Sequence, residues 1–115
     1  MYYILNVGMA DGEQTDFVYK QEYVEMVVNH AFRDLPKPCI RVSHKGDEPT
    51  AVVMVQLPRD HREDIMRIRV QALSKLMNQD CIAVWDMTEG KGELIGHDDA
   101  RTQKWGEFDE QHFQI

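Results

Sequence analysis

The stretch PRDHREDIMRIRVQALSKLMNQDCIAVWDM, residues 58–87, decides the fold because it predicts a helix followed at once by a buried strand. Asp60 can cap the first helical turn, while Glu63 and Asp64 complement the positive end of the helix dipole. Apolar residues then cover well over half of the helix circumference: Ile65, Met66, Ile68, Val70, Ala72, Leu73, Leu76 and Met77. We therefore expect a helix that is buried against a sheet and against a second surface as well.

Arg69 is out of place for a purely structural helix. It falls inside the apolar sector, next to Leu73 and Leu76 in projection. A guanidinium does not lose its proton on burial, so it must be paired or must reach water by extending its stem. Two interpretations are open: a salt bridge to a nearby carboxylate such as Asp86, or an anion-binding group for a ligand. Arg69 is therefore a candidate ligand-binding residue.

The rest of the chain completes a recognisable order of elements. Hydrophobic periodicity predicts a strand over 2–9, a helix over 17–35, a hairpin of strands over 39–44 and 50–57, and a last strand over 81–87. The order βαββαβ is that of the ferredoxin-like plait, so we predict an α+β fold: a four-stranded antiparallel sheet with two helices on one face.

The last residues differ in character from this core. We assign residues 1–87 to the core and residues 88–115 to an irregular acidic C-terminal extension. The extension carries several large apolar side chains, so we expect it to pack on the core or on a neighbouring subunit. A short edge strand around residues 93–95 is also expected.

Composition excludes several classes of protein. Thirteen basic and twenty acidic side chains give a formal net charge of −7, which opposes duplex nucleic acid as a partner. No apolar run is long enough for a membrane span, and no signal peptide is recognisable, so we expect a cytoplasmic protein. Cys39 and Cys81 each open a predicted strand, where free thiols are the default.

The face of the sheet away from the helices is the predicted location of function. Alternation along the strands places these residues there: Tyr2, Ile4, Asn6, Arg41, Ser43, Val52, Met54, Gln56, Ala83 and Trp85. Such a face is too apolar to remain in water, so the extension, a second copy, or a ligand or partner must cover it. We take Asn6, Arg41 and Trp85, together with Arg69, as the candidate ligand-binding residues.

A second group of residues predicts self-association. Amphipathic side chains form a stripe on the outer side of the first helix, and large aromatics recur in the extension: Tyr19, Tyr23, Met26, His30, Trp105, Phe108 and Phe113. The alternative for the tyrosines is ordinary surface exposure. We expect a homo-oligomer, a dimer or larger.

The sequence contains no recognised catalytic or metal-binding motif. There is no nucleophile elbow, phosphate loop or dinucleotide fingerprint. His97, Asp98 and Asp99 are adjacent but lack a spacing that pre-organises metal ligands. We therefore predict no metal, no cofactor and no assigned catalytic residue.

Two functions are consistent with these features. The first is a non-enzymatic, self-associating binding module that sequesters a protein partner or a small anionic ligand, by analogy with accessory or inhibitor proteins of mobile elements such as phages. The alternative is a cofactor-free dimeric α+β-barrel enzyme that acts on an organic substrate in the cavity between two sheets. Asp86, His30 and Arg41 would be its candidate residues. Whether the protein is an enzyme stays open at this point.

Overall fold

The secondary structure of the computed structural model follows the predicted order and then continues beyond it. The structure describes residues 1–11, 17–45, 48–60, 62–96 and 103–107. The elements in these ranges are β1 (Tyr2–Gly8), α1 (Gln21–Ala31), β2 (Cys39–Lys45), β3 (Glu48–Gln56), α2 (Glu63–Leu76), β4 (Cys81–Asp86), β5 (Lys91–Gly96) and β6 (Gln103–Glu107).

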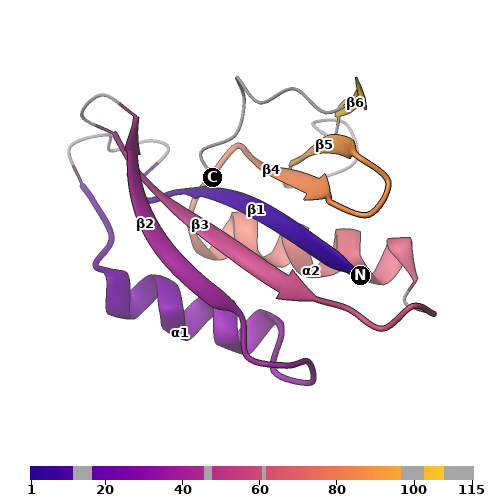
Figure 1. Cartoon of the computed structure of the whole chain (residues 1–115). Coiled ribbons are helices and arrows are strands. Elements are labelled where there is room, and N and C mark those ends of the chain that lie inside the picture. Colours follow the sequence, from indigo (N-terminus) through magenta and orange to yellow (C-terminus); the bar gives the residue numbers. More distant parts are fainter. Residues whose placement is uncertain (12–16, 46–47, 61, 97–102, 108–115) are drawn as a thin grey trace.

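The described strands form one sheet with the order β2-β3-β1-β4-β5-β6, and neighbouring strands are antiparallel. Both helices lie on the same side of this sheet (Figure 1). The prediction of an α+β fold with two helices and an antiparallel sheet is confirmed. The prediction of four strands is wrong, and the ferredoxin-like order covers only the four strands β2-β3-β1-β4 of this sheet.

The two additional strands come from the segment that we expected to be mostly irregular. Gly90 has a φ of 69° and supports a tight reversal after β4, so Asp86 pairs directly with Lys91 across the β4–β5 hairpin. Without β5, the outer edge of β4 would expose unpaired backbone groups. Ile95 of β5 also belongs to the main hydrophobic core, so the core extends past residue 87.

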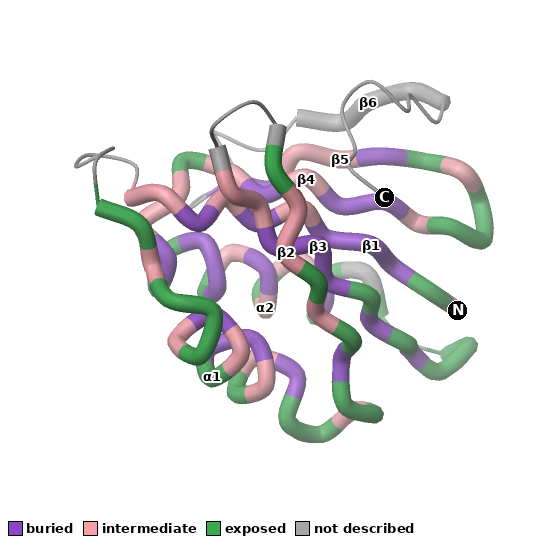
Figure 2. Tube along the Cα trace, turned by 60° about the vertical axis from the view of Figure 1, so that its left-hand side comes forward, coloured by how far each residue is buried: buried purple, intermediate pink, exposed green. Residues whose placement is uncertain are grey.

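The main core lies between the sheet and the two helices. Alternate residues of the strands face the helices. Figure 2 shows buried positions along the inner strands and along the helical turns that face the sheet. The fully buried side chains of this layer include Leu5, Val7, Val24, Val28, Phe32, Val53, Val55, Val70, Leu73, Met77 and Ile82. A site on the helix side of the sheet can therefore use only the strand residues that alternate with the outward-facing ones.

The first helix is shorter than the sequence predicts. Residues 17–20 are extended, because Tyr19 N–H donates to the carbonyl of Met9 and Asp11 N–H donates to the carbonyl of Phe17, both at 2.8 Å. Phe17 is therefore 51% exposed instead of lying in the core. Pairing with residues 9–11, just beyond β1, satisfies these backbone groups, and the helix begins only at Gln21.

The second helix buries one face only. Met66, Val70, Leu73 and Met77 pack against the sheet, as expected from their spacing. The opposite side remains accessible: Ile65 is 42%, Ile68 60% and Leu76 46% exposed. The prediction of a second packing surface is therefore wrong within the described part of this single chain. The helix also begins after Arg62, with no side-chain cap, instead of at Asp60.

The open face of the sheet is partly buried within the chain itself. Ile4 and Trp85 are cross-strand partners that face away from the helices, yet they are only 3% and 0% exposed. They form a small second cluster with Val52. Met54 on the same face is 43% exposed, so the covering is local. The expected contribution of residues 108–115 to this covering lies outside the described residues.

Candidate active site

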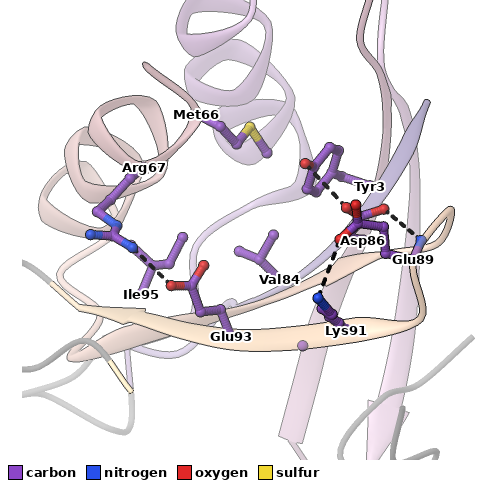
Figure 3. Close-up of a pocket in the computed structure, with 10 residues that line it drawn as sticks. Tyr3, Met66, Arg67, Val84, Asp86, Glu89, Lys91, Glu93 and Ile95 are labelled. Carbon is purple, nitrogen blue, oxygen red and sulfur yellow. Dashed lines mark hydrogen bonds and ion pairs between the residues drawn. The ribbon is translucent and has the colours of Figure 1, made fainter. Parts of the chain in front are cut away.

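A hollow of about 240 Å³ lies on the helix side of the sheet, between the N-terminal half of α2 and the β4–β5 hairpin (Figure 3). Its walls combine acidic, basic, aromatic and thioether side chains. They are Tyr3, Met66, Arg67, Val84, Asp86, Glu89, Lys91, Gly92, Glu93 and Ile95. We refer to this set as the acidic pocket.

Strand register brings these residues together. Tyr3 of β1 is the cross-strand partner of Asp86 in β4, and Asp86 is in turn the partner of Lys91 in β5. Val84 and Glu93 are partners one step further along the same hairpin. Because side chains alternate across a strand, all of these positions face α2. The pocket therefore depends on β5, the strand that lies beyond the predicted core.

Asp86 defines one end of the acidic pocket. The Tyr3 hydroxyl donates to one carboxylate oxygen of Asp86 at 3.5 Å, and the backbone N–H groups of Thr88 and Glu89 donate to the other at 2.9 and 3.1 Å. Within the described residues, no lysine or arginine is paired with Asp86. The backbone bonds hold the carboxylate in place and leave acceptor capacity for a cationic or hydrogen-bonding ligand.

An ion pair defines the other end. Arg67 of α2 reaches Glu93 at 2.9 Å, and Figure 3 shows the two side chains pointing toward one another, with Val84 lying between Glu93 and Asp86. Only one guanidinium nitrogen of Arg67 makes this contact, and its buried Nε has no hydrogen-bond partner in the described structure. The guanidinium is planar and can donate two parallel hydrogen bonds, so a carboxylate group on a ligand matches the side that Glu93 does not use.

The charge balance of the acidic pocket is slightly negative. Asp86, Glu89 and Glu93 face Arg67 and Lys91, so the lining carries three carboxylates against two cations. Lys91 is 3.6 Å from Glu89 and both are well exposed, so this pair contributes little binding energy. The pocket suits a ligand that has a net positive charge and also carries one anionic group.

Arg69 lies elsewhere and is paired within its own chain. It donates two hydrogen bonds of 2.6 Å to the carboxylate of Asp34 and one of 2.8 Å to the carbonyl of Ala31. The hydrogen bonds between the two side chains lower the pKa of Asp34 and raise that of Arg69. The salt-bridge partner is thus Asp34 and not Asp86. Arg69 lines a second hollow between the two helices, and its ligand-binding role stays a prediction.

Asn6, Arg41 and Trp85 lie on the face opposite the acidic pocket. Arg41 and Asn6 both have Val52 as a cross-strand partner, so they share one row of the open face with one strand between them. Arg41 is exposed, whereas Trp85 is fully buried beside Ile4. Their ligand-binding role stays a prediction, and Trp85 could contact a ligand only if its present covering moved.

Two of the predicted interface residues are packed within the chain. The rings of Tyr19 and Tyr23 stack at 5.2 Å, and their hydroxyls donate to Asp11 at 2.8 Å and to the carbonyl of Leu76 at 3.2 Å. Partial burial and the bond to Asp11 raise the pKa of Tyr19 to about 12. Their place in a subunit contact stays a prediction.

The remaining predicted interface residues divide into two groups. Met26 is 60% exposed and His30 is also exposed, so both are free to meet a partner. The side chains of Trp105, Phe108 and Phe113 lie outside the described residues, as does the adjacent group at 97–99.

Other features of the described residues are simpler. No three His, Cys, Asp or Glu side chains gather there in a way that could hold a metal ion. Cys39 and Cys81 are free thiols, the first exposed and the second half-buried. Burial, followed by the charge of Asp80, raises the pKa of Cys81. In the same part of the chain, neither helix has the length and apolar character needed to cross a bilayer.

Sequence reasoning named only one residue of the acidic pocket as a candidate for chemistry, namely Asp86. His30 and Arg41, named with it, lie on other surfaces. Met66 was placed only in the apolar sector of its helix. The pocket residues come from three separated segments, so no local spacing could reveal them.

Comparison with known proteins gives a likeness of fold. No family model matches the sequence, and no curated protein matches it. Among solved structures, the chain is similar to a phage SAM lyase in the apo state, with a TM-score of 0.55 and 16% identity over 92% of this chain and 91% of that chain. It is also similar to a phage SAM lyase in complex with S-methyl-5'-thioadenosine, with a TM-score of 0.51 and 15% identity over 95% and 89%.

This likeness corrects the main functional prediction. A non-enzymatic binding module is contradicted, because the solved structures that share the fold are of an enzyme. The alternative of a small enzyme fits better. The analogy with phage proteins agrees with the phage origin of these structural neighbours. The absence of a sequence motif misled the prediction, because it says nothing about sites assembled from distant segments.

Proposed function

We propose that this chain is a small enzyme, built on a ferredoxin-like core extended by two strands, that cleaves S-adenosylmethionine without adding water. The observation that carries the proposal is the acidic pocket in a fold shared with a phage SAM lyase over about nine tenths of both chains. A shared fold alone does not define an activity, so the chemistry of the pocket has to support the substrate.

The charges of the substrate complement those of the acidic pocket. S-adenosylmethionine carries a sulfonium, an ammonium and a carboxylate, which sum to one positive charge, whereas the pocket has one negative charge in excess. Asp86 is the carboxylate without a paired lysine or arginine in the described chain, so it is the natural partner of the ammonium or sulfonium. The ring of Tyr3 beside it adds a cation–π surface. Arg67 is the partner of the substrate carboxylate.

The reaction breaks the bond between the sulfonium sulfur and Cγ of the amino-acid side chain. Both bonding electrons go to sulfur, and the neutral thioether S-methyl-5'-thioadenosine leaves. Cγ either accepts the substrate's own carboxylate oxygen, which closes a five-membered lactone, or becomes an alkene carbon after Asp86 removes a proton from Cβ. Both routes balance without water, and the first removes two opposite charges. A charge-annihilating step proceeds faster in a site that excludes water.

The size of the pocket limits how much of the substrate it can enclose. At about 240 Å³ it is smaller than sites that hold a whole ligand of this size, which begin near about 300 Å³. We assign the amino-acid and sulfonium end to the acidic pocket, with the adenosyl group extending past its mouth near Glu89 and Lys91.

The test is the formation of S-methyl-5'-thioadenosine from S-adenosylmethionine, followed by mass spectrometry against heat-denatured protein. Asp86→Asn keeps the shape of the side chain and an oxygen that can accept from the backbone N–H groups of Thr88 and Glu89. We expect it to lower the rate of product formation about a hundredfold. The second product, lactone or unsaturated amino acid, identifies the route.

Arg41→Ala is the matched variant, because it removes an exposed charged group of the opposite face. We expect it to keep the activity. If no product forms above the spontaneous rate, the proposed activity is wrong. If Arg41→Ala abolishes the reaction while Asp86→Asn does not, the site lies on the open face. Unfolding curves of both variants separate lost chemistry from lost structure.

A further inference from the structure

The outer face of α2 is an apolar seam without a partner in the described structure. Its residues are Ile65, Ile68, Ala72 and Leu76, all classed as exposed, and they recur at intervals of three and four. This spacing puts them on one narrow stripe of a helix, the arrangement that packs against another helix. The sequence therefore predicts a covered surface, and the fold of one chain leaves it uncovered.

We propose that this seam is covered by the same seam of a second copy, with the two α2 helices antiparallel about a two-fold axis that crosses the seam at the level of residue 70. In this arrangement Ile65 of one copy meets Leu76 of the other. Ile68, the most exposed of the large seam side chains, enters the space above Ala72 of the second copy. Pairing a large side chain with a small one on the facing helix is how helices approach closely.

Charge complementarity selects the second copy in this orientation. Asp64 and Lys75 are both exposed and lie eleven residues apart, which places them about 20° apart around the helix and about 16 Å apart along it. They occupy the same flank of the seam, symmetrically about its centre. An antiparallel copy brings Asp64 opposite Lys75 of its partner, and the pair forms twice.

The existing contacts of these groups allow the new pairs. Asp64 accepts from Arg62 at 2.8 Å, but its side chain is still 57% exposed and a carboxylate can accept further bonds. Near the two-fold axis, Arg69 would approach its symmetry mate, and each is neutralised by Asp34 at 2.6 Å. No unpaired like charges of the described residues meet at the centre.

The long-range field also favours this face. The chain has a net charge of −7, so most surfaces of two copies repel one another. The groove that the seam residues line has a volume of about 500 Å³, and its described lining carries Arg33 and Arg69 against Asp34 alone, together with His30. This face therefore lacks the excess of negative charge that the chain carries as a whole.

The test is sedimentation equilibrium of the full chain over a range of concentrations. A single helix face is smaller than a standard protein interface, so we expect a dimer with a dissociation constant of about 10 to 100 µM. Ile68→Asp should weaken it at least about tenfold, because it places a charge at the most exposed seam position. Met54→Asp on the open face, also an exposed apolar residue, is the matched control and should leave the constant unchanged.

A charge exchange tests the orientation. Asp64→Lys or Lys75→Asp alone should weaken the dimer about threefold to tenfold, and the double variant should restore it, since the opposite charges meet again. A chain that is monomeric at about 0.5 mM overturns the proposal. So does a dimer that Met54→Asp dissociates and Ile68→Asp does not, which would place the contact on the sheet. Failure of the double variant to recover overturns the antiparallel register.

Discussion

Trp85→Ala tests whether the open face of the sheet is closed within a single chain. Trp85 is fully buried although it points away from both helices, and it packs with Ile4 and Val52. Burial of a tryptophan removes about 150 to 250 Å² from water, worth about 4 to 6 kcal/mol at about 25 cal/mol per Å². Measured losses for large aromatic residues in cores are about 3 to 5 kcal/mol, and we expect a value in that range.

The loss would be large relative to the whole stability. Domains of this size unfold with about 5 to 15 kcal/mol, so the variant would keep a small margin or unfold. The assay is urea denaturation followed by far-ultraviolet circular dichroism, because the fluorescence of Trp85 itself is lost. With an ordinary dependence of the free energy of unfolding on urea concentration, we expect the midpoint of unfolding to fall by about 2 M urea.

Met54→Ala is the matched control, since Met54 lies in the same cross-strand row and is 43% exposed. It should cost less than about 1 kcal/mol. A loss below about 1 kcal/mol for Trp85→Ala would refute the reasoning. It would mean that this face is open to water in solution and that the residue is available to a ligand, as the sequence alone suggested.

Two further predictions concern titration and reactivity. Tyr19 should ionise near pH 12, because partial burial and then Asp11 raise its pKa above the usual 10, and absorbance titration of wild type and Asp11→Asn measures this shift. Since the folded state favours the protonated hydroxyl of Tyr19, its contribution to the free energy of unfolding is present below pH 10 and is lost as the pH rises toward 12. A titration in which all tyrosines ionise near pH 10 would contradict the raised pKa. Exposed Cys39 should be alkylated by iodoacetamide near pH 8 well before Cys81, whose thiol is half-buried and has a raised pKa. Peptide mass spectrometry over time measures both rates, and equal rates would contradict the burial of Cys81.

Much of the fold followed from local patterns. The alternation in residues 50–57 and the 3.6-residue spacing of Met66, Val70, Leu73 and Met77 are direct consequences of strand and helix geometry, and the structure contains both elements. The start of α1 could not be predicted in this way, because residues 17–20 pair with residues 9–11, just beyond β1, through backbone bonds that any side chain permits. The strand β5 was only partly foreseen for the same reason.

The candidate site depended on contacts that no local pattern records. Asp86 was identifiable as a carboxylate after a buried strand, but its pairing with Tyr3 requires the β1–β4 register. Arg67 looked like an ordinary polar position until β5 placed Glu93 2.9 Å away. A salt bridge was one of the two interpretations of Arg69, and only the packing of the two helices decided that its partner is Asp34.

The sequence by itself determined the class of fold, the identity of most elements and the apolar character of α2 on both sides, because each of these depends on residues close together in the chain. The tertiary structure alone decided that the sheet continues past β4, that Trp85 is covered, and that an acidic pocket lies beneath α2. These features depend on which distant segments become neighbours, and that is a property of strand register and helix packing.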